Sequence, residues 1–178
     1  MVLLLLADGF EEIEALTPVD LLRRAGVDVK TVGVYSKIAV SSHSIPVICD
    51  LEASEVDLSL VEAIILPGGM PGATNLDKSP FVDLALRTVY ESGGRLAAIC
   101  AAPLVLGRRG LLKGVMATCY PGFENELIGA VKLDKKVVTD KRITTAVGMG
   151  ASLEFAKELV SLLVSKEKSE ELSSAIME

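Results

Sequence analysis

The 178-residue chain is 50% hydrophobic, contains 4% aromatic residues and no tryptophan, and has a formal net charge of −6. This length predicts one domain over residues 1–178, with a core of Leu, Val, Ile and Ala covered on both sides. The basic residues are scattered, which argues against nucleic acid as the main partner because phosphate binding needs a concentrated positive face.

Residues 2–7 form a continuous aliphatic run that predicts a strand buried on both faces. The run is too short to cross a bilayer, lacks a basic region, and is followed at once by acidic residues. We therefore expect a first strand rather than a signal peptide, and no membrane partner. The three cysteines are widely spaced with no Cys-x-x-Cys pair, which indicates a soluble protein of the reducing cytoplasm and no zinc site at the cysteines.

Strands and helices alternate along the rest of the chain. Residues 11–25 have apolar positions three to four apart, which predicts a helix that Pro18 kinks or restarts and Gly26 ends. Strands are predicted at 27–34, 63–66, 95–99, 115–119, 131–133, 137–139 and 143–147, with an edge hairpin over 38–41 and 45–49. Further helices are predicted at 80–92, after Cys100 as far as Arg109, at 152–164 and over the tail 166–178. This alternation predicts an α/β fold with a mainly parallel sheet, whose crevice lies at the carboxyl ends of the strands.

Cys100 stands where a predicted strand passes directly into an Ala- and Leu-rich helix. A cysteine at such a tight turn faces the amides of the helix N-terminus, which favour the thiolate, so we expect a lowered pKa. Free cysteine is also among the most buried residue types, so packing in the core is the alternative interpretation. Position alone does not separate the two.

Two other predicted strand ends should meet Cys100 in the same crevice. In the turn that contains Gly68 and Gly69, the Gly69 amide could form an oxyanion hole with the amide of Ala101, although a tight turn also explains the glycines. Glu14 lies one turn into the first helix, where burial would raise its pKa and let it share a proton with a thiolate. Taken alone, the acidic residues there also fit an ordinary helix start.

A cysteine hydrolase usually needs a histidine base, and the one histidine, His43, lies in the predicted edge hairpin. It would reach Cys100 only if the hairpin folded over the site or entered a neighbouring subunit, so we interpret it as a surface histidine. A Gly-x-Gly at residues 148–150 opens a helix and is weak evidence for an anion site. With no Walker A motif, dinucleotide fingerprint or metal-ligand cluster, the sequence predicts no cofactor and no metal.

Several motifs, in one order along nearly the whole chain, resemble the ThiJ/PfpI superfamily and its parkinsonism-associated deglycase branch. They lie at residues 7–14, 18–20, 23–26, 66–69, 97–103, 117–122, 148–150 and 154–156. The resemblance implies a flavodoxin-like three-layer sandwich, usually a homodimer, with Cys100 as a reactive cysteine in a strained nucleophile elbow. It also implies that Glu14 is its protonated partner and that Gly69 and Ala101 supply the oxyanion amides.

The chain departs from the family pattern at two positions. Tyr120 stands where many members have a histidine, which puts any histidine-dependent mechanism in doubt. Ala101 stands where the protease-like branch has a histidine directly after the nucleophile, which argues against peptidase activity.

Three functional hypotheses follow. The first is a cofactor-independent deglycase (a hydrolase) or glyoxalase III-like lyase that acts on methylglyoxal, or on its early adducts with amines or thiols, through Cys100, Glu14, Gly69 and Ala101. The second is a redox sensor or stress chaperone in which Cys100 is oxidised to a sulfinate stabilised by Glu14. A relative of the glutamine amidotransferases ranks last, because the required downstream His-Glu pair is missing.

Overall fold

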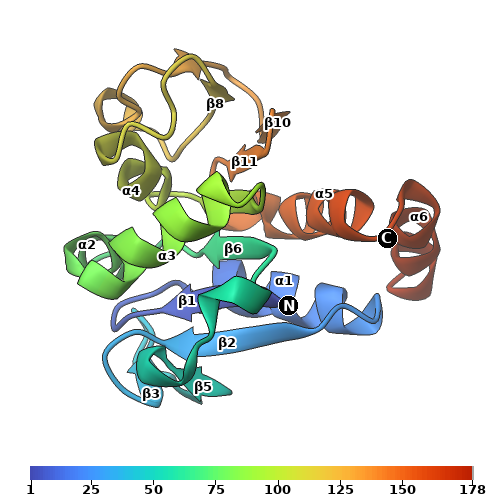
Figure 1. Cartoon of the computed structure of the whole chain (residues 1–178). Helices are drawn as coiled ribbons and strands as arrows, with labels where there is room; N and C mark the ends of the chain where they lie inside the picture. The colour runs from blue at the N-terminus through green and yellow to red at the C-terminus, as the bar shows by residue number, and fades with distance from the viewer. Residues whose placement is uncertain (178) are drawn as a thin grey trace.

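A seven-stranded sheet crosses the middle of the computed structural model, which describes residues 1–177 (Figure 1). Its order is β10-β11-β7-β6-β1-β2-β5, and each pair of neighbours is parallel except β10 with β11. The strands are β1 Val2–Leu6, β2 Val29–Gly33, β5 Leu51–Glu52, β6 Ala63–Leu66, β7 Arg95–Ile99, β10 Val137–Asp140 and β11 Ile143–Ala146.

Helices cover both faces of this sheet and bury a separate apolar cluster on each. One face packs against α2 (Gly72–Lys78), α3 (Pro80–Glu91) and α4 (Pro103–Arg108), and the other against α1 (Glu12–Arg24), α5 (Ser152–Leu163) and α6 (Lys166–Ala175). Strand β1 shows why: Leu3 and Leu5 belong to the first cluster, and Leu4 and Leu6 to the second. Since successive strand residues point to opposite faces, an unbroken aliphatic run serves two cores at once. The predicted flavodoxin-like three-layer sandwich is confirmed.

Short strands and 3-10 turns lie at the carboxyl ends and edges of the sheet. The predicted hairpin is present as antiparallel β3 and β4, while β8 and β9 form a separate two-stranded parallel pair. Their bounds are β3 Ile38–Val40, β4 Pro46–Ile48, β8 Met116–Ala117 and β9 Val131–Lys132. Four 3-10 turns complete the described elements: η1 Ala53–Glu55, η2 Leu58–Leu60, η3 Glu124–Glu126 and η4 Met149–Ala151.

Three local features differ from the sequence pattern. Of the two outcomes predicted at Pro18, a restart does not occur, because Pro18 is buried within one continuous helix that packs against α5 and the sheet. Residues 72–78 form helix α2, which the sequence pattern does not predict. The strand expected at 115–119 shortens to β8, since the backbone N–H groups of Thr118 and Tyr120 donate to Thr145 Oγ1 and to the Cys100 carbonyl. Gly26 does end α1, in a left-handed conformation with φ +83°.

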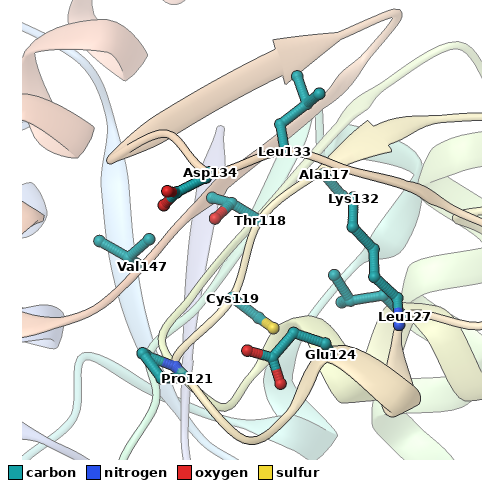
Figure 2. Close-up of a pocket in the computed structure, with 10 residues that line it drawn as sticks. All are labelled: Ala117, Thr118, Cys119, Pro121, Glu124, Leu127, Lys132, Leu133, Asp134 and Val147. Carbon is teal, nitrogen blue, oxygen red and sulfur yellow. The ribbon is translucent and has the colours of Figure 1, made fainter.

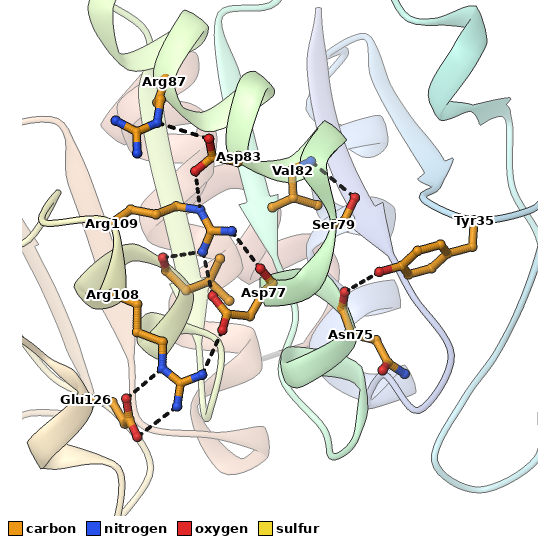
Figure 3. Close-up of polar contacts among 11 residues, drawn as sticks. Tyr35, Asn75, Asp77, Ser79, Val82, Asp83, Arg87, Arg108, Arg109 and Glu126 are labelled. Atoms are coloured by element: carbon orange, nitrogen blue, oxygen red, sulfur yellow. Dashed lines mark hydrogen bonds and ion pairs between the residues drawn. The ribbon is translucent and has the colours of Figure 1, made fainter.

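Two arginines that follow Cys100 along the chain tie α4 to its neighbours (Figure 3). The largely buried Arg109 guanidinium pairs with Asp77 at 2.6 Å and with Asp83 at 3.1 Å. Arg108 bridges Asp77 and Glu126 at 2.7 and 2.8 Å. This network joins α2, α3, α4 and η3, and so fixes the helix that begins just after Cys100. Among the described helices, none has both the length and the apolar character that a bilayer crossing requires.

Candidate functional site

Three strand ends meet at the carboxyl edge of the sheet, as the sequence predicts. The backbone N–H of Glu11, after β1, donates to the Gly68 carbonyl after β6 at 2.9 Å. The N–H of Gly72 donates to the Gly9 carbonyl at 3.1 Å, and that of Cys100, after β7, to the Ala146 carbonyl of β11 at 2.9 Å. The first two bonds fix the turns after β1 and β6 to each other, and the third fixes the turn after β7 to the end of β11.

Cys100 lies at the centre of this edge. Its φ of 65° is left-handed, a conformation that costs free energy for a residue with a Cβ. The side chain is half-buried, and the backbone N–H groups of Gly69 and Ala101 both donate to its sulfur. Two amides that converge on one sulfur can hold negative charge there, or on an oxygen bonded to it.

Glu14 is the partner of this thiol, and its side chain is only 1% exposed. Its carboxyl is hydrogen-bonded to Cys100 and accepts from the backbone N–H groups of Gly68, at 2.9 Å, and Met149. Burial is the largest influence and raises the pKa of Glu14 to about 7, as predicted. The anion held by the glycine-rich turn at 148–150 is therefore the Glu14 carboxylate.

Burial also raises the pKa of the Cys100 thiol to about 12, with the Glu14 charge and hydrogen bond adding to the rise. The prediction that the helix N-terminus lowers the pKa of Cys100 is therefore wrong when the thiol faces an ionised Glu14. The amides of Gly69 and Ala101 act in the expected direction, but they are outweighed. Two acids in contact titrate as a pair, and this pair keeps one proton and one negative charge over a wide pH range.

Gly68 lies beside both members of the pair, and the sequence did not reveal that its missing side chain lets them meet. A Cβ at this position would lie 2.6 Å from Cys100 Cβ and 2.6 Å from Glu14 Oε2. Only glycine therefore fits between the thiol and the carboxyl. The Gly68 amide is bonded to Glu14, and the Gly69 amide is the one directed at the sulfur, as predicted.

His43 is not an isolated surface histidine. Its side chain is 65% exposed, and its Nδ1 lies 3.0 Å from Glu12 Oε1 and 3.7 Å from Glu11 Oε2. The hydrogen bond that His43 donates to Glu12, followed by the charges of both acids, raises the pKa of His43. The hairpin thus does fold onto α1, and it brings His43 to the acidic first turn of that helix.

Tyr120 lies beside the site and is half exposed. Its backbone N–H donates to the Cys100 carbonyl at 2.9 Å, and its ring lies against Gly148. A cavity of about 490 Å³ is lined by Tyr120, Gly148 and Met149, among others. A Cβ on Gly148 would lie 3.9 Å from Cys100 Sγ, so Gly148 separates this cavity from the sulfur by little more than its own backbone.

A second cavity, of about 320 Å³, contains a different cysteine (Figure 2). Cys119 lies on its wall with its sulfur toward Glu124, and Lys132 and Asp134 are also at its edge. Burial, and then the charge of Glu124, raises the pKa of Cys119 to about 11. No part of the Cys100–Glu14 pair lines this cavity.

The fold and this geometry define a flavodoxin-like protein with a cysteine–carboxyl pair at the carboxyl ends of its parallel strands. The sequence profile of the DJ-1/PfpI family matches residues 1–162. The chain belongs to the DJ-1/PfpI family, in its DJ-1-like branch, as the motifs predict.

Relatives and solved structures agree with this assignment. Protein DJ-1 homolog A of Arabidopsis thaliana is 38% identical over 181 residues, which are 99% of this chain and 46% of that protein. The chain spans less than half the length of the two Arabidopsis relatives it matches. The Caenorhabditis elegans glutathione-independent glyoxalase DJR-1.2 is 32% identical over 172 residues, which are 96% of this chain and 91% of that protein. The structure of oxidized Toxoplasma gondii DJ-1 superposes with a TM-score of 0.95 and 35% identity, covering 99% and 97% of the two chains.

Proposed function

We propose that this protein is a cofactor-independent enzyme of the glyoxalase or deglycase type. Its substrate is methylglyoxal, or an early adduct of methylglyoxal with an amine or thiol. The observation that carries the proposal is the Cys100 sulfur, which shares a proton with buried Glu14 and faces the amides of Gly69 and Ala101. The name of the Caenorhabditis elegans relative, a glutathione-independent glyoxalase, supports it.

In the proposed reaction the Cys100 thiolate forms a C–S bond to the aldehyde carbon of methylglyoxal. The electron pair of the C=O bond moves to oxygen, which the amides of Gly69 and Ala101 stabilise. Glu14, with a pKa of about 7, accepts the thiol proton and returns it to that oxygen. A proton then moves from the carbon bonded to sulfur to the neighbouring ketone carbon, which oxidises the first, reduces the second and leaves a lactoyl thioester. Water breaks the C–S bond of this thioester and releases lactate and the Cys100 thiol, so electrons balance within the substrate.

The test is replacement of Cys100 by alanine, with Cys119→Ala as the matched control at a thiol outside the pair. Lactate is measured as the product, because amines in the buffer also consume methylglyoxal. We expect Cys100→Ala to reduce conversion at least about 1,000-fold, as loss of a covalent nucleophile does, and Cys119→Ala to retain it. Wild-type rates in Cys100→Ala would show the mechanism to be wrong.

A second candidate function uses the same sulfur as a redox sensor. Protonated Glu14 and two amides around Cys100 would stabilise the oxygens of a sulfinate as they would an oxyanion. A solved relative, Toxoplasma gondii DJ-1, is described as oxidized. A chaperone role in oxidative stress belongs to this alternative.

Homodimer formation and a cytoplasmic location stay predictions. The surface that favours a second copy of the chain is apolar and combines the outer side of α1 with the β3–β4 hairpin. Its exposed side chains are Ile13, Leu16, Ile38, Val40, Ile45 and Ile48. Apolar surface of this kind on two adjacent elements is typical of interaction sites.

A further inference from the structure

The hairpin loop and the first turn of α1 together present three side chains that ligate metals. Ser41 forms a bridge with Phe10, and the backbone N–H of Ser42 donates to the Phe10 carbonyl at 2.8 Å. The same loop is closed by the His43 backbone N–H, which donates to Ser41 Oγ at 3.3 Å. The loop is therefore fixed on α1, and His43 is held against Glu11 and Glu12 by backbone contacts as well as by charge.

The three ligand atoms lie close enough together to share one zinc ion. One oxygen each of Glu11 and Glu12 and one ring nitrogen of His43 all lie within 4.8 Å of one another. Zinc binds nitrogen and carboxylate oxygen at about 2.0–2.2 Å, so ligands at tetrahedral angles are about 3.4 Å apart. The distances from His43 Nδ1, 3.0 Å to Glu12 and 3.7 Å to Glu11, fall on either side of that value. The two His43 distances therefore need adjustments of only a few tenths of an ångström.

A separate observation concerns the other oxygen of Glu12. Glu12 Oε2 is buried and has no hydrogen-bond partner among the described residues. A buried carboxylate oxygen without a partner is costly, because it has lost its water and gained nothing in return. A cation bound by the other oxygen of Glu12 would withdraw negative charge from this one and reduce that cost.

Both carboxylates are poised to bind a cation. The side chains of Glu11 and Glu12 are only 15% and 16% exposed. Two carboxylates close together with little water around them attract positive charge, and an imidazole nitrogen favours a transition metal over Mg²⁺ or Ca²⁺.

We propose that Glu11, Glu12 and His43 form a binding site for a divalent transition metal, Zn²⁺ in particular. With three protein ligands, the fourth position stays open to water or a small anion. The bound metal links the β3–β4 hairpin to the start of α1. At that point the Glu11 N–H donates to the Gly68 carbonyl. This site is separate from the Cys100–Glu14 pair and does not depend on the proposed function.

The experiment is calorimetric titration of the chelator-treated, full-length protein with ZnCl₂. Cys100→Ser and Cys119→Ser are included, because a thiolate is the commonest competing zinc ligand. We expect one Zn²⁺ per chain in the wild type and in both serine variants. In His43→Asn and Glu12→Gln the affinity should fall more than about 100-fold, beyond the loss caused by removing a group that only orients a ligand.

Co²⁺ absorption identifies the ligands independently, since thiolate coordination produces an intense near-ultraviolet charge-transfer band that nitrogen and oxygen ligands do not. We expect visible Co²⁺ bands without this band, and we expect His43→Asn to abolish them. Thermal unfolding in chelator checks that His43→Asn is folded, and added Zn²⁺ should raise the Tm of the wild type only. Zinc binding that survives His43→Asn but is lost in Cys100→Ser would overturn the proposal.

Discussion

Cys100 and Cys119 are two thiols in the same half of the sequence that occupy different chemical surroundings. Burial raises the pKa of each, to about 12 and about 11, and each has a glutamate whose charge raises it further. At Cys100 that glutamate is buried and hydrogen-bonded to the thiol, and two amides donate to the sulfur. The pKa of Cys119 is instead affected only by burial and by the charges of Glu124 and Lys132.

The comparison shows that a raised thiol pKa does not distinguish a reactive cysteine from an inert one. What differs is where the thiol proton can go. Glu14, with a pKa of about 7, can exchange a proton with Cys100 without bulk water. Within residues 1–177, no hydrogen bond to a carboxyl or amide contributes to the pKa of Cys119.

The largest effect that tests this difference is expected from Glu14→Gln, with Glu124→Gln as the matched change beside Cys119. Glutamine keeps the size of the side chain but cannot shuttle a proton. We expect lactate formation from methylglyoxal to fall about 100- to 10,000-fold in Glu14→Gln and to stay within about twofold of wild type in Glu124→Gln.

The pH dependence of Cys100 alkylation separates proton transfer from a general disturbance of the site. In the wild type we expect a rise in rate near pH 7, where the pair loses its first proton. In Glu14→Gln this step should disappear, because the carboxyl that titrates there is gone. An unchanged profile would mean that Glu14 does not activate the thiol.

Much of this architecture could be predicted from residue patterns. The aliphatic run of β1 and the short run of β6 identify central strands because both of their faces are buried. The position of Glu14, one turn into a helix that starts at the crevice, was enough to predict its burial and the direction of its pKa shift.

The remaining features depend on distances between segments far apart in the sequence. The pKa of Cys100 was predicted in the wrong direction because the helix amides are local, whereas burial and the Glu14 charge come from other elements. Gly68 fits between two side chains that are 86 residues apart in sequence, Glu14 and Cys100, so no local pattern reveals its role. His43 meets Glu11 and Glu12 only because the hairpin folds onto α1.

A third prediction concerns stability, which should depend on pH at the Cys100 site through Glu14. Folding raises the pKa of Glu14 from 4.5 to about 7, so the native state binds this proton more tightly than the unfolded chain. The stabilisation is fully present below pH 4.5 and is lost as the pH rises through 7. Its size is about 3 kcal/mol.

Urea unfolding at pH 5 and pH 8, in wild type and Glu14→Gln, measures this contribution. The wild type should lose about 2.5 kcal/mol of unfolding free energy relative to Glu14→Gln between the two values. Glu124→Gln, at the second cysteine, should follow the wild type. If the difference between wild type and Glu14→Gln were constant with pH, Glu14 would not be the buried acid described above.

The smallest expected effect is selectivity of oxidation, which decides between the two candidate functions of Cys100. Each equivalent of hydrogen peroxide transfers one oxygen atom to the sulfur and leaves as water, so two equivalents convert thiolate to sulfinate. We expect Cys100 to react roughly tenfold faster than Cys119 or Cys49. Of the three cysteines, only Cys100 can pass its proton to a neighbouring carboxyl and accept hydrogen bonds from two amides at its sulfur. Peptide mass analysis after brief exposure measures the three rates. Equal rates would remove the basis for a sensor, while selective oxidation with no methylglyoxal conversion would favour the sensor over the enzyme.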